Sequence, residues 1–246
     1  MISAVQLGKI FWEDKAGTDE YGALEASYVL KGEDFGVPDK KAEDKESTEE
    51  AKDPGFPDIQ VDFAALEGIN GDFLGWLYIP ALEVEYPVVQ GADNDYYINH
   101  TFENKINRAG AIFMDAQASP DLSDYNTVIY GHNMRNRSMF GSLKLFIQDE
   151  ELCKSNPYFY LYTPDAVYRY LIASYYVTRE GSQTYTLPGT AEQYEKYRTY
   201  MLHSTPYRSE IELPAQGNIV TLSTCYGKAG GDQRFVVHGI LDAVQE

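Results

Sequence analysis

The pattern of apolar and polar positions changes at Ile59. After that residue the chain contains short runs of branched and aromatic residues separated by turn-forming residues, a pattern typical of β-strands. Eight runs are predicted as strands: Trp76–Ile79, Val84–Val89, Ala111–Met114, Thr127–Tyr130, Tyr158–Tyr162, Val167–Val177, Ile219–Ser223 and Arg234–Leu241. Pro80 and Pro87 lack the backbone N–H of a central strand position, so they limit pairing to strand ends or edges.

Apolar residues recur at helical spacing in only a few places. The spacing predicts a short amphipathic helix over Val61–Ile69 and two further helices over Phe140–Leu152 and Ala191–Leu202. Many short strands in succession, joined by hairpin turns such as Thr163–Asp165, favour a closed barrel over a parallel sheet. The sequence therefore predicts a mainly β fold.

The N-terminal part of the chain has a different character. Residues 1–60 contain fifteen Asp or Glu against seven Lys, and the run Asp39–Asp53 is mostly polar. Such a run cannot bury enough apolar surface to offset the entropy lost on ordering. We predict an acidic extension or tether over residues 1–57 and a folded domain over residues 58–246. A lid that folds over a cleft is the alternative for the extension.

Composition excludes some classes of function. The formal net charge of -18 argues against a nucleic-acid partner, because phosphate binding needs clustered Lys and Arg. The aromatic fraction of 14%, with 21 tyrosines, supports the prediction of many strands. No stretch reaches the roughly 18 to 20 apolar residues that span a bilayer, and Met1–Trp12 is too short for a spanning helix or a secretion signal.

Three predicted strands carry a reactive side chain at one end. His132 comes just after an apolar strand and a glycine, and Cys225 ends another apolar strand. Arg234 opens the last strand, directly after a polar, glycine-rich loop. A side chain at a strand end is held in place by the sheet and still reaches solvent.

These three residue types suit nucleophilic catalysis. A thiol with an ordinary pKa near 8.5 is only slightly ionised at neutral pH, and a nearby imidazolium or guanidinium favours the thiolate. Attack of the thiolate on a carbonyl places negative charge on oxygen, which Arg234 is suited to stabilise. His132 can protonate a leaving amine and deprotonate an incoming one.

Each residue alone also has an ordinary structural explanation. Cys225 could be a small core residue, His132 a loop histidine, and Arg234 a surface charge paired with Asp232. Cys153 follows a predicted helix, a context unlike that of Cys225, so we do not expect a disulfide.

The remaining histidines do not indicate a further site. His238 alternates along the last strand and is predicted to be structural, whereas His100 and His203 lie in polar surroundings. With only two cysteines, far apart, the spacing of zinc ligands is absent. We predict no metal site and no cofactor.

Three motifs together carry the candidate residues: YGHNM at Tyr130–Met134, TLSTC at Thr221–Cys225 and RFVVHG at Arg234–Gly239. In this order they resemble the sortases, the cell-wall transpeptidases of Gram-positive bacteria, and the GHNM form resembles class B. Gly75–Pro80, Tyr86–Gln90 and Asp93–His100 are similar to early strands and a short helix of class B enzymes. The resemblance covers roughly residues 60–246.

The resemblance implies a fold and a reaction. It implies an eight-stranded sortase-type β-barrel with an N-terminal helix and a helix between strands six and seven, here Ala191–Leu202, as one wall of a substrate groove. It implies that Cys225 cleaves a sorting motif of the Asn-Pro-x-Thr type after Thr, through a thioester. An amine of a peptidoglycan precursor or a pilin then takes up the acyl group.

The resemblance also implies residues that hold the sorting peptide. Asn94, Ile98 and Ser223 match such positions, and Thr224 and Tyr226 flank the nucleophile beside them. Tyr226 departs from the acidic or polar residue that often follows the cysteine. The implied location is the outer face of the plasma membrane, through an anchor that this chain is expected to lack.

Two other functions remain open on the sequence. A hydrolytic cysteine protease would share the thioester chemistry, although the order of residues argues against a papain-like enzyme, in which the cysteine precedes the histidine. A catalytically silent peptide-binding barrel at the cell surface is the second alternative, and the presence of all three reactive residues disfavours it.

Overall fold

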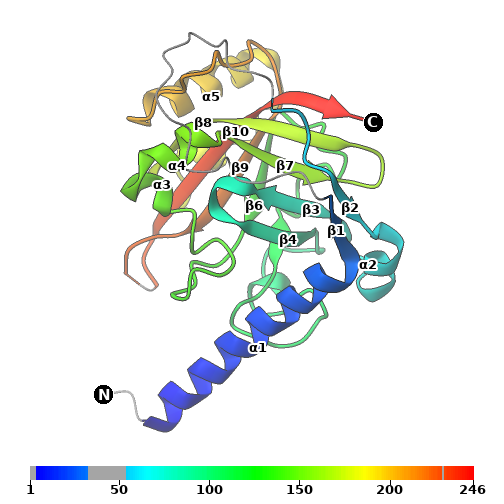
Figure 1. The fold of residues 1–246 in the computed structure, drawn as a ribbon. Coiled ribbons are helices and arrows are strands. Elements are labelled where there is room, and N and C mark those ends of the chain that lie inside the picture. The colour runs from blue at the N-terminus through cyan, green and yellow to red at the C-terminus, as the bar shows by residue number, and fades with distance from the viewer. Residues whose placement is uncertain (1–3, 33–53, 229) are drawn as a thin grey trace, which may run out of the picture.

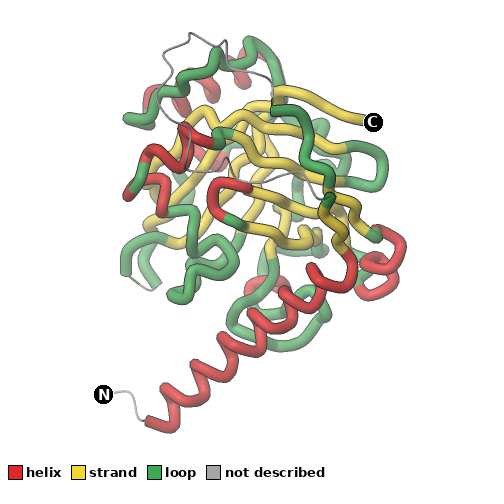
Figure 2. The backbone as a smooth tube through the Cα atoms, viewed as in Figure 1, coloured by secondary structure: helices red, strands yellow, loops and turns green. Residues whose placement is uncertain are grey.

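The computed structural model describes residues 4–32, 54–228 and 230–246, and a closed barrel of eight strands dominates it (Figures 1 and 2). The barrel order is β10-β8-β7-β3-β4-β5-β6-β9, with β9 paired to β10. The strands are β3 (Phe73–Ile79), β4 (Val84–Val89), β5 (Ile112–Met114), β6 (Asn126–Tyr130), β7 (Tyr158–Tyr162), β8 (Val167–Arg179), β9 (Ile219–Cys225) and β10 (Gln233–Gln245). The predicted mainly β barrel is confirmed, and each predicted strand falls within or next to one of these strands.

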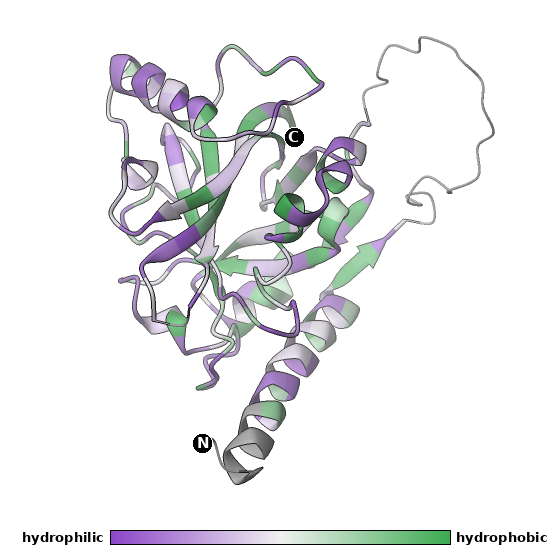
Figure 3. Cartoon of the chain, turned by 90° about the vertical axis from the view of Figure 1, so that its left-hand side faces the viewer, coloured by the Kyte–Doolittle hydropathy of each residue, from purple (hydrophilic) through white to green (hydrophobic). Residues whose placement is uncertain are grey.

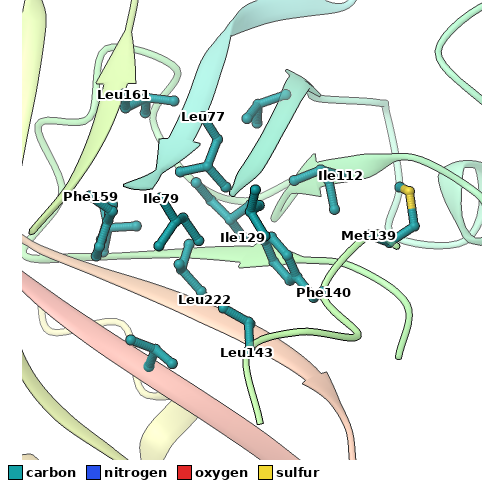
Figure 4. Packing of buried hydrophobic residues seen from close by; sticks show 14 of the residues in the cluster. Leu77, Ile79, Ile112, Ile129, Met139, Phe140, Leu143, Phe159, Leu161 and Leu222 are labelled. Carbon is teal, nitrogen blue, oxygen red and sulfur yellow. The ribbon is translucent and has the colours of Figure 1, made fainter. Parts of the chain in front are cut away.

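The barrel closes around an apolar core. Alternate side chains of each strand point inward, as the pleat of a strand requires, and the labelled residues of Figure 4 come from five of the eight strands and the segment after β6. Leu77, Ile129, Phe159 and Leu222 have no exposed surface. Burying each such side chain contributes about 1.5–3 kcal/mol, so the core holds the strand ends in fixed relative positions.

The strand β9 lies between β6 and β10, and this arrangement brings three strand ends together. β6 runs parallel to β9, with Tyr130 opposite Ser223. β10 runs antiparallel to β9, with Arg234 opposite Cys225. The C-terminal ends of β6 and β9 and the N-terminal end of β10 therefore meet at one edge of the barrel.

Two of the predicted helices are present. α2 (Phe63–Ile69) begins at Asp62, whose carboxylate accepts a hydrogen bond from the backbone N–H of Ala65 at 3.0 Å. α5 (Ala191–His203) connects β8 and β9, the sixth and seventh barrel strands, as the resemblance implies. The tyrosines and methionine that α5 buries pack against a second apolar cluster on the outside of the barrel.

The predicted helix over Phe140–Leu152 is wrong in its extent. The segment begins with turns and contains two shorter helices, α3 (Leu145–Gln148) and α4 (Glu150–Ser155). Asp149 separates them, because its extended backbone ends α3 and its carboxylate accepts the Glu151 N–H at 3.1 Å to cap α4.

Residues 4–32, the first part of the predicted acidic extension of residues 1–57, are folded. These residues form α1 (Ala4–Tyr28) and β1 (Val29–Lys31), and β1 pairs with β2 (Ile59–Val61). Figure 3 shows that polar residues cover much of α1, yet Tyr21, Leu24 and Val29 are buried in the main core. The acidic average hid a narrow apolar stripe at helical spacing. The polar run Asp39–Asp53 lies outside the described residues.

Candidate active site

A cavity of about 490 Å³ opens at the edge where the three strand ends meet. His132, Cys225 and Arg234 all line it. Other parts of the wall come from three segments: the residues around the short helix η2 (Tyr96–Ile98), the turn after β8, and the short helix η3 (Gln183–Tyr185). The three sequence candidates for nucleophilic catalysis thus share one cavity.

Cys225 is the last residue of β9, and its side chain is exposed. Its backbone carbonyl accepts a hydrogen bond from Asn133 Nδ2 at 2.8 Å, and Lys144 Nζ donates to Asn133 Oδ1, also at 2.8 Å. The segment that carries His132 is therefore tied to the end of the strand that carries the thiol.

His132 follows Gly131, whose backbone N–H donates to the Ser223 carbonyl at 3.1 Å and extends the pairing of β6 with β9. A side chain at residue 131 would place its Cβ 2.5 Å from Ile112 and 2.8 Å from the Phe140 ring, so only glycine fits there. The glycine lets the backbone just before His132 lie directly against the core.

The imidazole of His132 is oriented by a backbone carbonyl. Its Nε2 lies 2.6 Å from the carbonyl oxygen of Ile98. A carbonyl oxygen can only accept a hydrogen bond, so Nε2 carries the proton and Nδ1 is the nitrogen that can exchange one.

Arg234 is held by its own loop and by one carboxylate. Nη1 donates to the carbonyls of Gly231 at 2.9 Å and Gln233 at 3.0 Å, and Nη2 donates to Glu180 Oε2 at 2.7 Å. Glu180 follows β8, and its side chain is 69% exposed, so this ion pair is open to exchange with a ligand. The Nε–H and one Nη2–H of Arg234 have no partner among the described residues.

Two polar networks line the cavity beside the three candidates. The Tyr185 hydroxyl lies 2.8 Å from Ser223 Oγ, and burial raises the pKa of Tyr185, so the phenol stays protonated. On the other side, the Tyr130 hydroxyl and Asn94 Nδ2 both donate to Asp115 Oδ2, at 2.9 and 3.1 Å. Burial, and then the Asp115 charge, raise the pKa of Tyr130.

Comparison with known protein families identifies the family of this chain. The family model described as the sortase domain matches residues 77–242, most of the chain, which include all three candidates. The chain belongs to the sortase family. Sortases are cysteine transpeptidases associated with the cell wall of Gram-positive bacteria, so this protein is an enzyme of that type. The resemblance to sortases found in the sequence is confirmed.

Sortases named sortase B are among the relatives. Sortase B of Listeria monocytogenes is 32% identical over 193 residues, which are 75% of this chain and 75% of the relative. Sortase B of Staphylococcus aureus is 26% identical over 167 residues, covering 68% of each chain.

Solved structures agree. Sortase B of Bacillus anthracis in complex with AAEK1 superposes with a TM-score of 0.73 at 28% identity, covering 94% of this chain and 99% of that one. A Staphylococcus aureus sortase B–substrate complex has a TM-score of 0.67 at 26% identity, covering 73% of this chain and 84% of that one.

Four of the five residues predicted to bind peptide line the cavity of this sortase, and Tyr226 does not. Asn94, Ile98 and Ser223 line the cavity. Thr224 borders it, but its hydroxyl is buried without a partner among the described residues, so a contact with peptide would come from its backbone. Tyr226 is not among the lining residues, because side chains alternate along the strand and its ring packs 6.2 Å from that of Phe235.

Several lining residues of this sortase were not predicted from the sequence. Tyr130, Glu180 and Tyr185 belong to the wall, and Asn133 ties its edges together. Tyr130 and Asn133 stand within the YGHNM motif beside His132, which was a usable signal. Glu180 and Tyr185 lie in a turn and a short helix, where the sequence carries no periodic pattern.

Neither a metal site nor a membrane span is found in this sortase over the part of the chain that the structure describes. In residues 4–32, 54–228 and 230–246, no three His, Cys, Asp or Glu side chains are grouped to hold a metal ion. No described helix has the length and apolar character needed to cross a bilayer.

Proposed function

We propose that this sortase cleaves a sorting motif of the Asn-Pro-x-Thr type after Thr and transfers the acyl group to an amine. The observation that carries the proposal is the shared cavity, in which thiol, imidazole and guanidinium line one space. Its volume of about 490 Å³ lies within the roughly 300–1,000 Å³ of ligand pockets. The substrate complex of the Staphylococcus aureus relative supports a peptide as ligand.

Acylation begins when the proton of the Cys225 thiol passes to His132 and the sulfur attacks the threonine carbonyl carbon. The carbonyl π electrons move to oxygen, and the unpartnered N–H groups of Arg234 stabilise the resulting charge, an effect that is typically several kcal/mol. When the tetrahedral intermediate collapses, the C–N bond breaks and His132 gives a proton to the leaving amine. The product of this half-reaction is a thioester on Cys225.

Deacylation reverses these roles. His132 takes a proton from an acceptor amine, and the amine attacks the thioester carbonyl. The C–S bond breaks, and Cys225 is released as a thiolate as the new amide forms. We propose an amine of a peptidoglycan precursor or a pilin lysine as acceptor, at the outer face of the plasma membrane.

The residues that line the cavity present different chemical groups to the peptide. Asn94, Ile98 and Ser223 present an amide, an apolar side chain and a hydroxyl to the cavity. The amide of Asn94 is held at both ends, since its Oδ1 also accepts the Ala116 N–H at 2.8 Å. Such an oriented wall suits a motif with one amide and one hydroxyl side chain.

A fluorogenic Asn-Pro-x-Thr peptide, incubated with and without an amine acceptor, tests the proposal. We expect a product whose mass contains the acceptor amine and whose rate of formation rises with acceptor concentration. Cleavage at a rate that is the same with and without the amine, giving no product that contains it, would indicate a hydrolytic protease instead. No reaction, with no labelling of Cys225 by a thiol reagent, would indicate a peptide-binding barrel.

A further inference from the structure

The middle of α1, from Glu13 to Tyr21, lies on the irregular segment 99–111, between η2 and β5. Asn107 Nδ2 donates to the Glu13 carbonyl at 3.0 Å, and the Cβ of Ala109 would be 3.0 Å from a Cβ placed on Gly17. Helix and segment are therefore in close contact, with no room for a larger residue at position 17. Figure 1 shows α1 running past this part of the barrel.

At this contact the hydroxyl of Tyr21 both donates and accepts a hydrogen bond. Tyr21 is 5% exposed, its hydroxyl donates to the Gly110 carbonyl at 2.6 Å, and the same oxygen accepts the Phe102 N–H at 3.2 Å. The phenol thus joins two points of segment 99–111 that lie far apart along it. Burial raises the pKa of Tyr21, so the phenol remains a donor at every pH used for an assay.

Gly110 connects Tyr21 to the active site. Its backbone has a φ of 58°, and an added Cβ would lie 2.5 Å from the Tyr97 carbonyl oxygen and 2.7 Å from that of Ile98. The neighbouring Ala111 N–H donates to the Tyr97 carbonyl at 3.0 Å. Gly110 therefore packs directly against the carbonyl that holds the imidazole of His132.

We infer that Tyr21 is a positioning residue for His132, acting through Gly110 and the Ile98 carbonyl. The inference rests on the proposed role of His132 in proton transfer. The path has three contacts: the Tyr21 hydroxyl to Gly110, Gly110 to the Ile98 carbonyl, and that carbonyl to His132 Nε2 at 2.6 Å. Helix α1 thereby becomes part of the catalytic unit.

The physical basis is the choice of tautomer. A neutral imidazole carries its proton on either nitrogen, and a fixed acceptor at Nε2 leaves Nδ1 free for exchange. If the Ile98 carbonyl moves, the preference weakens and the ring turns more freely. Displacements of about 1 Å at such a group can lower the rate by as much as about 10²-fold.

Tyr21→Phe tests the inference because it keeps the ring, which packs edge-on against Tyr86 at 5.2 Å, and removes only the hydroxyl. We expect kcat for transpeptidation to fall by about tenfold with a smaller change in KM. Tyr28→Phe on the same helix is the matched control, since the Tyr28 hydroxyl makes no hydrogen bond with any described residue. It should retain wild-type kcat.

A second readout follows the imidazole itself. Nitrogen-15 NMR of His132, recorded at a pH where the ring is neutral, should show the Nε2–H tautomer in the wild type and a mixture of tautomers in Tyr21→Phe. Gly110→Ala should produce the same change with α1 intact, because its Cβ would press on the Ile98 carbonyl. This readout does not depend on turnover, so it tests the inference even if the proposed substrate is wrong.

The outcomes separate the explanations. A mixed tautomer in both variants, with a lowered kcat in any that turn over, supports the inference. A lowered kcat with an unchanged tautomer in a folded Tyr21→Phe protein overturns it, as does a change in KM alone. Wild-type behaviour of Tyr21→Phe in both measurements also overturns it, whatever Gly110→Ala shows.

Discussion

The protein places one histidine and one cysteine at the cavity edge and another of each in its buried interior. His132 and Cys225 lie at strand ends beside the cavity. His238, in the middle of β10, and Cys153, in α4, have no exposed surface. The same residue types thus occupy two environments within one fold.

The buried pair is held in neutral form. Thr221 donates its hydroxyl proton to Asn126 at 2.7 Å and lies 2.9 Å from Nδ1 of His238, so it accepts from that nitrogen. Burial lowers the pKa of His238 to about 3. Burial raises the pKa of the Cys153 thiol to about 12. Neither group changes charge near neutral pH.

The difference shows that position along a strand decides what these side chains can do. A side chain in the middle of β10 is enclosed by the Tyr176 and Tyr197 rings, at 5.3 and 6.3 Å from that of His238. A side chain at the end of β9 meets the cavity. A reactive thiol needs solvent access and a nearby cation: Cys225 is exposed with Arg234 opposite it on β10, whereas Cys153 is fully buried.

Replacing each cysteine in turn gives the largest expected contrast. Cys225→Ala should lower turnover of the sorting peptide by at least about 10³-fold, because it removes the nucleophile. Cys153→Ala should stay within about threefold of wild type at a temperature where it is folded. Steady-state assays and circular dichroism measure both, and loss of activity in a folded Cys153→Ala protein would contradict the contrast.

Arg234→Lys should lower kcat/KM by about 10²-fold, because lysine keeps the charge but lacks the planar set of donors. Arg179→Lys is the matched control: Arg179 forms an exposed ion pair with Asp232 at 3.0 Å on the neighbouring strand end. It should retain activity. Equal activity of both variants would assign Arg234 a structural role.

His238→Gln should change the stability of the protein in acid. The folded-state pKa of about 3 lies below the ordinary 6.5, so the folded protein binds fewer protons than the unfolded chain over that range. The wild type loses up to about 1.4 kcal/mol per pH unit from this group as pH falls from 6.5 towards 3. Urea unfolding should show that slope reduced in His238→Gln and unchanged in His203→Gln, an exposed control.

Cys153→Ala should change stability only in alkali. The folded-state pKa of about 12 lies above the ordinary value of about 8.5, so the contribution of this thiol is fully present below that value and lost as pH rises towards 12. Comparing unfolding free energies at pH 8 and 10 should give a shallower fall for Cys153→Ala than for wild type. Identical slopes would mean that the thiol is not buried.

The barrel, and the three residues that line one cavity at its edge, could be predicted from the sequence, because strand periodicity and motif order are local signals. Cys225 opposite Arg234 follows once β9 and β10 pair in their observed register. The hydrogen bond from His132 to the Ile98 carbonyl could not be predicted, since it joins irregular segments.

Two contacts of the structure could not be predicted from averages over the sequence. Averaging charge over residues 1–60 hid the stripe of Gly17, Tyr21 and Leu24 that seats α1 on the barrel. Tyr226 was assigned to peptide binding from its place next to Cys225, whereas the alternation of side chains turns its ring towards Phe235. In both cases the spacing of individual residues along the helix or strand indicates the contact, and an average or a neighbouring residue does not.

The central claim is that Cys225 is the nucleophile in the cavity that it shares with His132 and Arg234. Its most direct test is mass spectrometry of the enzyme after incubation with a small library of Asn-Pro-x-Thr peptides and no amine. We expect an adduct equal to the peptide fragment that ends in Thr, mapped to Cys225 and released as an amide when an amine is added. An adduct on Cys153, or none on Cys225 while the folded protein still cleaves the peptide, would contradict the account.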